Sequence, residues 1–277
     1  MKKKMLSLLL VVALAATAVI GGTLAYFTDT DAQTNEFTMG DVEVDLWEVF
    51  DAEAATDMVP GEKVNKDVYV ENIGTNDSYV RVHVAIPAKF DDGDPEFNAS
   101  QNFLHWNFTS ESVADGQWSW LPEYSAGKGY QGNGAGKWNF YTTKIGEGEE
   151  AEVYNVYVAT YRTALKRGEV TATEAITGIY LDKTVDCEVT RDENNKITKI
   201  TYKDNKGNAV EVTDFETPFA IKVAVEATQA EGFENAYDAL NTAFGKIENK
   251  EYTKINWNTI ETEYKQFVDE WPVSTEG

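Results

Sequence analysis

The sequence predicts a mainly β fold, a jelly-roll-type β-sandwich with long loops and short C-terminal helices. Many segments alternate apolar and polar residues with a period of two, and residues typical of turns separate them. Helical spacing of three and four residues is confined to the end of the chain. Hydrophobic residues make up 42% of the 277 residues, which is enough to build a core of this kind.

The strands are predicted where one face of the alternation is apolar. In the first of them, Val42, Val44 and Leu46 alternate with three acidic residues. A three-stranded meander is expected near the surface, and Cys187, which has the same parity as two valines, is expected to be buried as a small apolar residue. The predicted strand segments are 42–46, 64–70, 79–86, 151–164, the meander at 184–213, and 219–226.

Two amphipathic helices are predicted after the last strand, at 233–247 and 258–270, and Pro272 ends the second. Residues 90–150 are rich in Trp, Gly and Asn and predict long loops. The tryptophans of this region favour a core cap beneath the loops, with a carbohydrate-binding surface as the alternative, because flat indole rings can stack on sugars.

The first residues predict an export signal. Three lysines at positions 2–4 precede an apolar run over 5–20, which is shorter than the ~20 residues of a membrane-spanning helix. A small residue, Ala25, then precedes a plausible cleavage site. We therefore expect a signal peptide at 1–25 and a secreted protein at the cell surface or in the extracellular matrix. An uncleaved N-terminal membrane anchor is the alternative.

Charge and composition exclude several classes of function. The chain has 24 Lys and Arg against 47 Asp and Glu, a formal charge of −23, and removal of 1–25 leaves −26. Nucleic-acid binding needs a basic footprint and is therefore not expected. One cysteine excludes a disulfide framework within the chain, and two histidines leave little material for histidine chemistry.

The junction after the apolar run carries a family resemblance. The stretch GGTLAYFTDT at 21–30, followed by NEFTMGDVEVDL at 35–46, resembles the N-terminus of the TasA and camelysin family of extracellular matrix-fibre proteins of Gram-positive biofilms. The resemblance implies cleavage by a SipW-type signal peptidase after Ala25 or Tyr26. It also implies a fibre subunit whose partners are copies of itself or sibling subunits.

The new N-terminus predicts a mechanism of assembly. Residues 26–36 are polar apart from Tyr26 and Phe27, and Thr28 favours an extended backbone. Such a segment can add itself as a strand to the sheet edge of a neighbour, with Phe37 at the entry into the sandwich domain. The domains expected are 1–25, the donor segment at 26–36, the sandwich at 37–230 and a C-terminal helical segment at 231–277. Because the subunits are strongly acidic, salt, divalent cations or acid should promote assembly.

No catalytic residue or cofactor is predicted. His83 and His105 lack the H-E-x-x-H spacing of zinc proteases, although the family resemblance leaves a camelysin-like metalloendopeptidase as the alternative. The acidic loop with Asp91, Asp92 and Asp94 offers oxygen ligands of the kind that Ca²⁺ prefers, but a solvated loop is the expected state in so acidic a chain.

Overall fold

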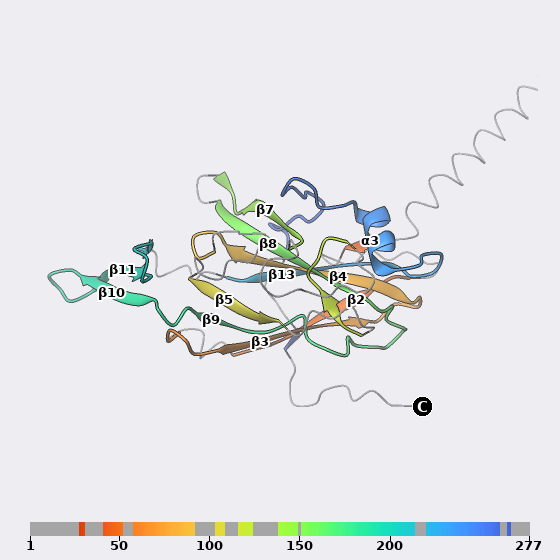
Figure 1. Cartoon of the computed structure of the whole chain (residues 1–277), viewed down its shortest axis with the longest axis horizontal. Helices are drawn as coiled ribbons and strands as arrows, with labels where there is room; N and C mark the ends of the chain where they lie inside the picture. The colour runs from red at the N-terminus through yellow and green to blue at the C-terminus, as the bar shows by residue number, and fades with distance from the viewer. Residues whose placement is uncertain are drawn as a thin grey trace, which may run out of the picture.

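The computed structural model describes most of the chain between the first predicted strand and the end of the helical region. The described residues are 28–30, 41–51, 58–91, 103–108, 116–123, 138–148, 151–213, 220–260 and 265–266. They form two large sheets, a smaller third sheet and one short helix (Figure 1). The mainly β sandwich predicted from the sequence is confirmed.

The first sheet has the strand order β1-β13-β4-β8-β6, and β7 also pairs with β8. All of its pairs are antiparallel. Strands β4 and β13 are joined over eight residue pairs, so β13 is firmly held on that side. The strands are β1 (Thr28–Thr30), β4 (Ser78–Pro87), β6 (Trp118–Ser119), β7 (Phe140–Ile145), β8 (Glu152–Tyr161) and β13 (Lys222–Gln229).

The second sheet has the order β14-β2-β3-β9-β5. Its pairs are antiparallel except that β14 runs parallel to β2. Alternate residues of β3 are buried between the sheets, as the period-two pattern predicts. The strands are β2 (Val44–Phe50), β3 (Val64–Asn72), β5 (Leu104–Phe108), β9 (Ile176–Leu181) and β14 (Lys265–Gln266).

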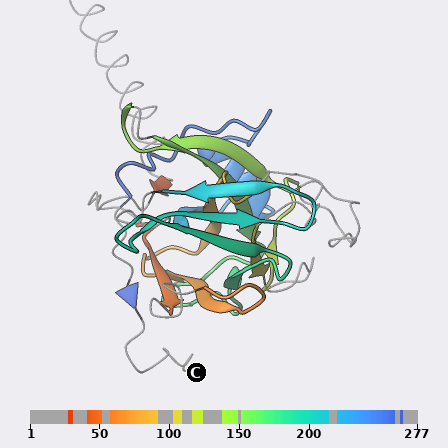
Figure 2. The same ribbon diagram turned by 90° about the vertical axis from the view of Figure 1, so that its left-hand side faces the viewer.

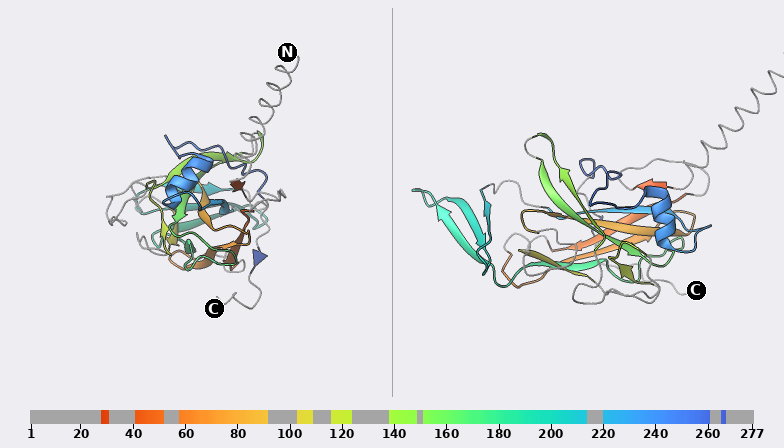
Figure 3. Two further views of the ribbon diagram at one scale, coloured as in Figure 1. Left: turned by 90° about the vertical axis from the view of Figure 1, so that its right-hand side faces the viewer. Right: turned by 45° about the horizontal axis from the view of Figure 1, so that its top comes forward.

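Strand β4 is buried on both faces. Val80, Val82 and Val84 pack into the core between the two sheets. Arg81 and His83 point to the opposite face, which is covered by the helix α3 (Ala236–Phe244) and the segment that follows it. Figure 3 shows α3 lying against the first sheet. The molecule therefore has a second, smaller core outside the sandwich.

The helical predictions are confirmed in part. α3 lies within the first predicted helix, and its N-cap Asn235 accepts a hydrogen bond from the backbone N–H of Asp238 at 3.0 Å. The second prediction, a helix over 258–270, is wrong where the chain is described, because Lys265–Gln266 form β14. No helix of the described residues is long and apolar enough to cross a membrane.

A tight turn fixes the start of β2 against the end of β3. The backbone N–H of Gly74 donates to the carbonyl oxygen of Glu43 at 2.9 Å and to the side-chain oxygen of Asn72 at 3.0 Å. A Cβ atom at Gly74 would lie 2.6 Å from the carbonyl oxygen of Asp41 and from the amide nitrogen of Glu43. Only glycine leaves room for this approach, which holds the chain just before β2.

The predicted meander forms the third sheet, which projects from the end of the sandwich (Figures 1 and 2). Its strands are β10 (Asp186–Arg191), β11 (Ile197–Lys203) and β12 (Ala209–Val212). Cys187 is exposed here, so the prediction that it is buried is wrong. All residues of β10 are exposed, because the strand lies beyond the body of the protein, where alternation of residues no longer implies a buried face.

Candidate functional site at the edge of the first sheet

Strand β1, the only described strand of the N-terminal segment, pairs with the outer edge of β13. Thr28, Asp29 and Thr30 of β1 pair antiparallel with Thr228, Ala227 and Glu226. β13 is eight residues long, and within the described ranges no strand pairs with Lys222–Val225 on this side. The edge therefore has three positions occupied by this chain and a further stretch along which a strand could continue.

Of the residues predicted to act in assembly, Thr28 is part of this edge, opposite Thr228. Ala25, Tyr26, Phe27 and Phe37 lie outside the described residues. The position of Thr28 brings the predicted donor segment together with a specific strand, which sequence patterns could not identify.

A buried polar cluster lies directly behind this edge, on the outer face of the sheet. Glu226 accepts hydrogen bonds from Nε of Arg81 at 2.6 Å and from the hydroxyl of Tyr252 at 2.5 Å. Nε2 of His83 lies 3.0 Å from the same carboxylate, and Nδ1 of His83 lies 3.3 Å from the hydroxyl of Tyr141. Glu226 and His83 are fully buried.

The cluster fastens the C-terminal segment to the sheet. Nη1 of Arg81 donates to Asn241 in α3 at 3.3 Å, and Nη2 donates to the hydroxyl of Tyr252 at 2.8 Å. The guanidinium also lies over the rings of Phe244 and Tyr252, 5.6 and 5.3 Å from their centroids. Trp257 donates from its indole N–H to Tyr141 at 3.1 Å. These contacts satisfy the buried charges and fasten α3 to the sheet beside β13.

The electrostatics of the cluster follow from burial and from these contacts. Burial alone would raise the pKa of Glu226, but His83, Arg81 and Tyr252 together lower that pKa to about 2. Burial lowers the pKa of His83, against the opposing effect of Glu226. At neutral pH Glu226 is therefore ionised, whereas burial disfavours the charged form of His83. The imidazole of His83 has zero solvent exposure and contacts Glu226 and Tyr141.

The second histidine lies in the other sheet. His105 in β5 is 3.0 Å from Oδ2 of Asp182 and stacks on Tyr180 with ring centroids 5.1 Å apart. Hydrogen bonds from Thr184 and the contact with His105 lower the pKa of Asp182 against the effect of its partial burial. Among the residues that the structure describes, no three His, Cys, Asp or Glu side chains could jointly hold a metal ion.

Asp91, one of the three acidic residues considered for Ca²⁺, is buried and not part of a solvated loop. It accepts a hydrogen bond from the hydroxyl of Tyr157 at 2.7 Å, and its backbone carbonyl accepts one from Asn155 at 2.8 Å. Asp91 thus packs against β8 through its hydrogen bonds with Asn155 and Tyr157. Asp92 and Asp94 lie outside the described residues.

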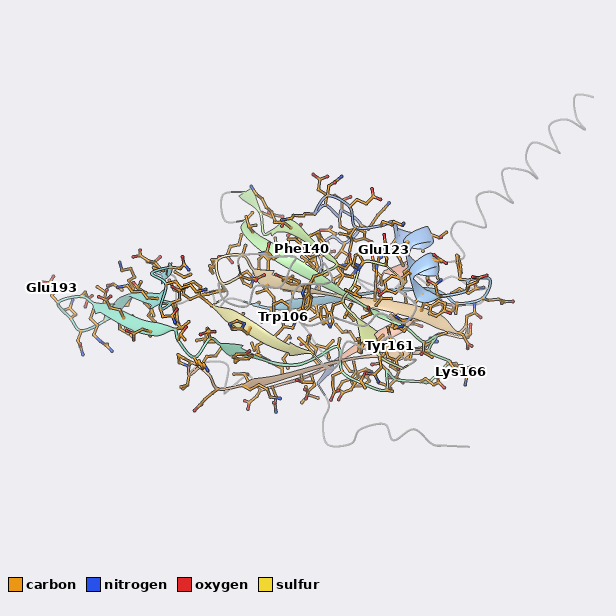
Figure 4. The ribbon with its side chains drawn as sticks, in the orientation of Figure 1. Trp106, Glu123, Phe140, Tyr161, Lys166 and Glu193 are labelled. Carbon is orange, nitrogen blue, oxygen red and sulfur yellow. The ribbon has the colours of Figure 1, made fainter. Side chains whose placement is uncertain are left out.

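The tryptophans of the middle region are in the core, as favoured from the sequence. Trp106, Trp118, Trp120 and Trp138 are all at most 8% exposed, and Trp106 lies within the body of the protein in Figure 4. Trp106 packs against Tyr157 with ring centroids 4.5 Å apart. A sugar ring has no access to these faces, so the described tryptophans do not form a carbohydrate platform.

The comparisons with known proteins concern the N-terminal part of the chain. Residues 1–103 match the model of a protein family described as camelysin metallo-endopeptidase. The N-terminal part of the chain is therefore similar to the camelysin family. The predicted family resemblance is thereby confirmed. The matched residues contain β1 to β4, whereas β13 and α3 follow them in the chain. Searches among curated proteins and among solved structures found no match.

Proposed function

We propose that this chain is an exported structural protein that builds or decorates extracellular matrix fibres. In this proposal the mature N-terminal segment, 26–36, adds as a strand to the β13 edge of a neighbouring subunit. The observation that carries it is the pairing of Thr28–Thr30 with β13 at the edge of the first sheet. Strand addition to an open edge is a common mode of association, because the main chain supplies the hydrogen bonds.

The energetics of β1 favour exchange between subunits. A backbone hydrogen bond contributes about 0.5–1.5 kcal/mol net, whereas fixing the backbone of one residue costs about 1–2 kcal/mol. For the three-residue pairing within one chain, the free energy gained from hydrogen bonds therefore roughly equals the entropic cost of fixing the backbone. A segment held this weakly can leave its own β13 and pair with that of another copy at little cost.

The length of the edge supports a longer pairing between subunits. If the register of β1 continues, position 34 would lie opposite Lys222, and the donor segment would cover all of β13. Donor and acceptor are different surfaces, so the contact is head-to-tail and generates an open filament. Export follows from the predicted signal peptide, and the similarity to the camelysin family is in keeping with a cell-surface or secreted protein.

Disulfide trapping tests the pairing directly. Thr28→Cys combined with Thr228→Cys, in a Cys187→Ser background, places two thiols at opposed positions. After mild oxidation we expect a ladder of covalent oligomers on non-reducing gels. The matched control is Thr28→Cys with Thr190→Cys, which is on the projecting sheet and should give no ladder. Oxidised monomer alone would contradict exchange between subunits.

A truncation tests whether the segment drives assembly. The mature chain beginning at residue 26 should form filaments visible by electron microscopy, increasingly so with salt, because screening reduces repulsion between subunits of charge −26. The chain beginning at residue 37 should keep its circular dichroism spectrum but stay monomeric. A synthetic peptide of residues 26–36 should bind it one to one, and a scrambled peptide should not. Filaments formed without residues 26–36 would refute the mechanism.

A camelysin-like metalloendopeptidase is the second candidate, and the description of the matched family favours it. It requires a metal site accessible to a peptide, whereas His83 is enclosed by Glu226 and Tyr141. Stoichiometric zinc in the purified mature chain, together with proteolysis that a chelator abolishes, would establish this function and displace the structural one.

A further inference from the structure

A second buried charge pair lies inside the sandwich, far from the cluster under α3. Glu48 of β2 and Lys66 of β3 face inward, between strands whose other inward residues are mainly apolar. Nζ of Lys66 is 2.6 Å from Oε2 of Glu48, and the two side chains are 3% and 0% exposed. The ammonium also lies 5.2 Å from the centre of the Phe50 ring. The two side chains thus meet in an environment closed to water.

This pair is poorly satisfied as an ion pair. Oε1 of Glu48 is buried and has no hydrogen-bond partner among the described residues, and an unpartnered oxygen of a buried carboxylate is costly. Burial raises the pKa of Glu48, although the nearby Lys66 opposes the rise. Transfer of one proton from the ammonium to the carboxylate removes both charges. It leaves a neutral amine in contact with a carboxylic acid.

We propose that Lys66 and Glu48 condense into an intramolecular amide, an isopeptide cross-link between β2 and β3. The lone pair of Nζ attacks Cδ of the protonated Glu48 carboxyl group and forms the C–N bond. The C–OH bond then breaks, and the hydroxyl leaves as water with one proton from the amine. No redox change occurs and no co-reactant is needed. The product replaces two buried charges and an unpartnered carboxylate oxygen with one neutral amide.

Two features of the site favour the reaction. The folded sandwich holds amine and carboxyl in contact, and such positioning can correspond to an effective concentration of about 10⁵–10⁸ M. The dry surroundings favour neutral groups over ions and disfavour the reverse hydrolysis, which needs water. The protein also contains a comparison: Lys89 and Glu152 are equally close, at 2.6 Å, but are 39% and 45% exposed. Because water reaches that pair and favours hydrolysis of an amide, it should remain unlinked.

Intact-mass spectrometry of the full chain, purified under native conditions, tests the proposal. We expect a mass about 18 Da below the value calculated for the purified polypeptide, because one water is lost. Peptide mapping should find the peptides that contain Glu48 and Lys66 joined, and those with Lys89 and Glu152 separate. Lys66→Arg keeps a cation beside Glu48 but has no amine to acylate, so it should show the full calculated mass.

The outcome does not depend on any variant folding, since the wild-type chain gives the decisive mass. A wild-type chain at its full calculated mass after days at neutral and mildly acidic pH would overturn the cross-link. A loss of water that maps to peptides other than these two would also overturn it. The mass measurement does not depend on filament formation. It therefore distinguishes the absence of the cross-link from a failure of the proposed assembly mechanism.

Discussion

Arg81→Met is the most informative single change in the cluster beneath α3. It removes the hydrogen bonds to Glu226, Tyr252 and Asn241 and leaves Glu226 buried at zero exposure without its guanidinium partner. Breaking a buried ion pair from one side typically costs about 3–5 kcal/mol, because the remaining charge is uncompensated. In a protein of this size that corresponds to a fall in melting temperature of roughly 10 °C.

A double-mutant cycle shows whether the loss comes from the stranded charge. Arg81→Met, Glu226→Gln and the double variant are unfolded in urea and followed by circular dichroism. The double variant should be more stable than the sum of the single losses implies, by about 2 kcal/mol or more, since neither charge is then left alone. Lys89→Met is the matched control: it removes an equally close but exposed pair and should cost less than about 1 kcal/mol.

Additive losses, or an Arg81→Met variant that unfolds within about 1 kcal/mol of the wild type, would refute the reasoning. Either result would mean that water reaches Glu226 in solution, so that the charge is not stranded. The cluster would then not be what holds α3 on the sheet behind the candidate acceptor strand.

Three further outcomes are expected. The pKa of Glu226 is lowered to about 2, and the pKa of His83 lies below its ordinary 6.5. Both groups therefore bind protons less tightly in the folded protein than in the unfolded chain. Their stabilisation is therefore complete above pH 6.5 and is lost as the pH falls, most steeply below 4.5, which urea titrations at several pH values will measure. Glu226→Gln should remove the lower part of this dependence. Gly74→Ala should lower the free energy of unfolding by about 1–3 kcal/mol, since the new Cβ must displace backbone, and calorimetry will detect it. Cys187 should react with one equivalent of a thiol reagent without denaturant, slowly at neutral pH because partial burial and Asp186 raise its pKa; reaction only after unfolding would contradict its exposure.

Most strands could be predicted from the sequence, because one-sided burial imposes a period of two. The same rule reveals the face of a residue but not whether anything covers that face. Arg81 and His83 alternate with the valines of β4 and so lie on its outer face, yet this face is buried by α3. Cys187 has the parity of a core residue, yet β10 projects away from the body and leaves it exposed.

The C-terminal end shows the limit of helical spacing as evidence. Ile260, Tyr264 and Phe267 recur at steps typical of a helix, but Lys265–Gln266 pair with Trp47 and Glu48 of β2. Pairing with a strand more than 200 positions away is decided by tertiary contacts, and local periodicity contains no information on it. The sequence could not predict the proposed acceptor strand for the same reason. It suggested a donor segment at 26–36, and the pairing of Thr28–Thr30 with β13 is seen only in the topology.

The proposed cross-link and the proposed donor strand lie on one mechanical path. A filament under tension would transmit force from the neighbour's β13 through the donor segment into β2, which follows it in the chain and pairs with β3 over seven positions. An amide between Glu48 and Lys66 would bind β2 to β3 covalently, within the strand that first receives this force. We therefore expect Lys66→Arg to assemble to the same extent as the wild type, since the β13 edge is unchanged. Its filaments should lose subunit structure at a lower guanidinium concentration, measured by circular dichroism of pelleted filaments. Equal resistance of the two filaments would mean that β2 is held by its ladder and the core alone.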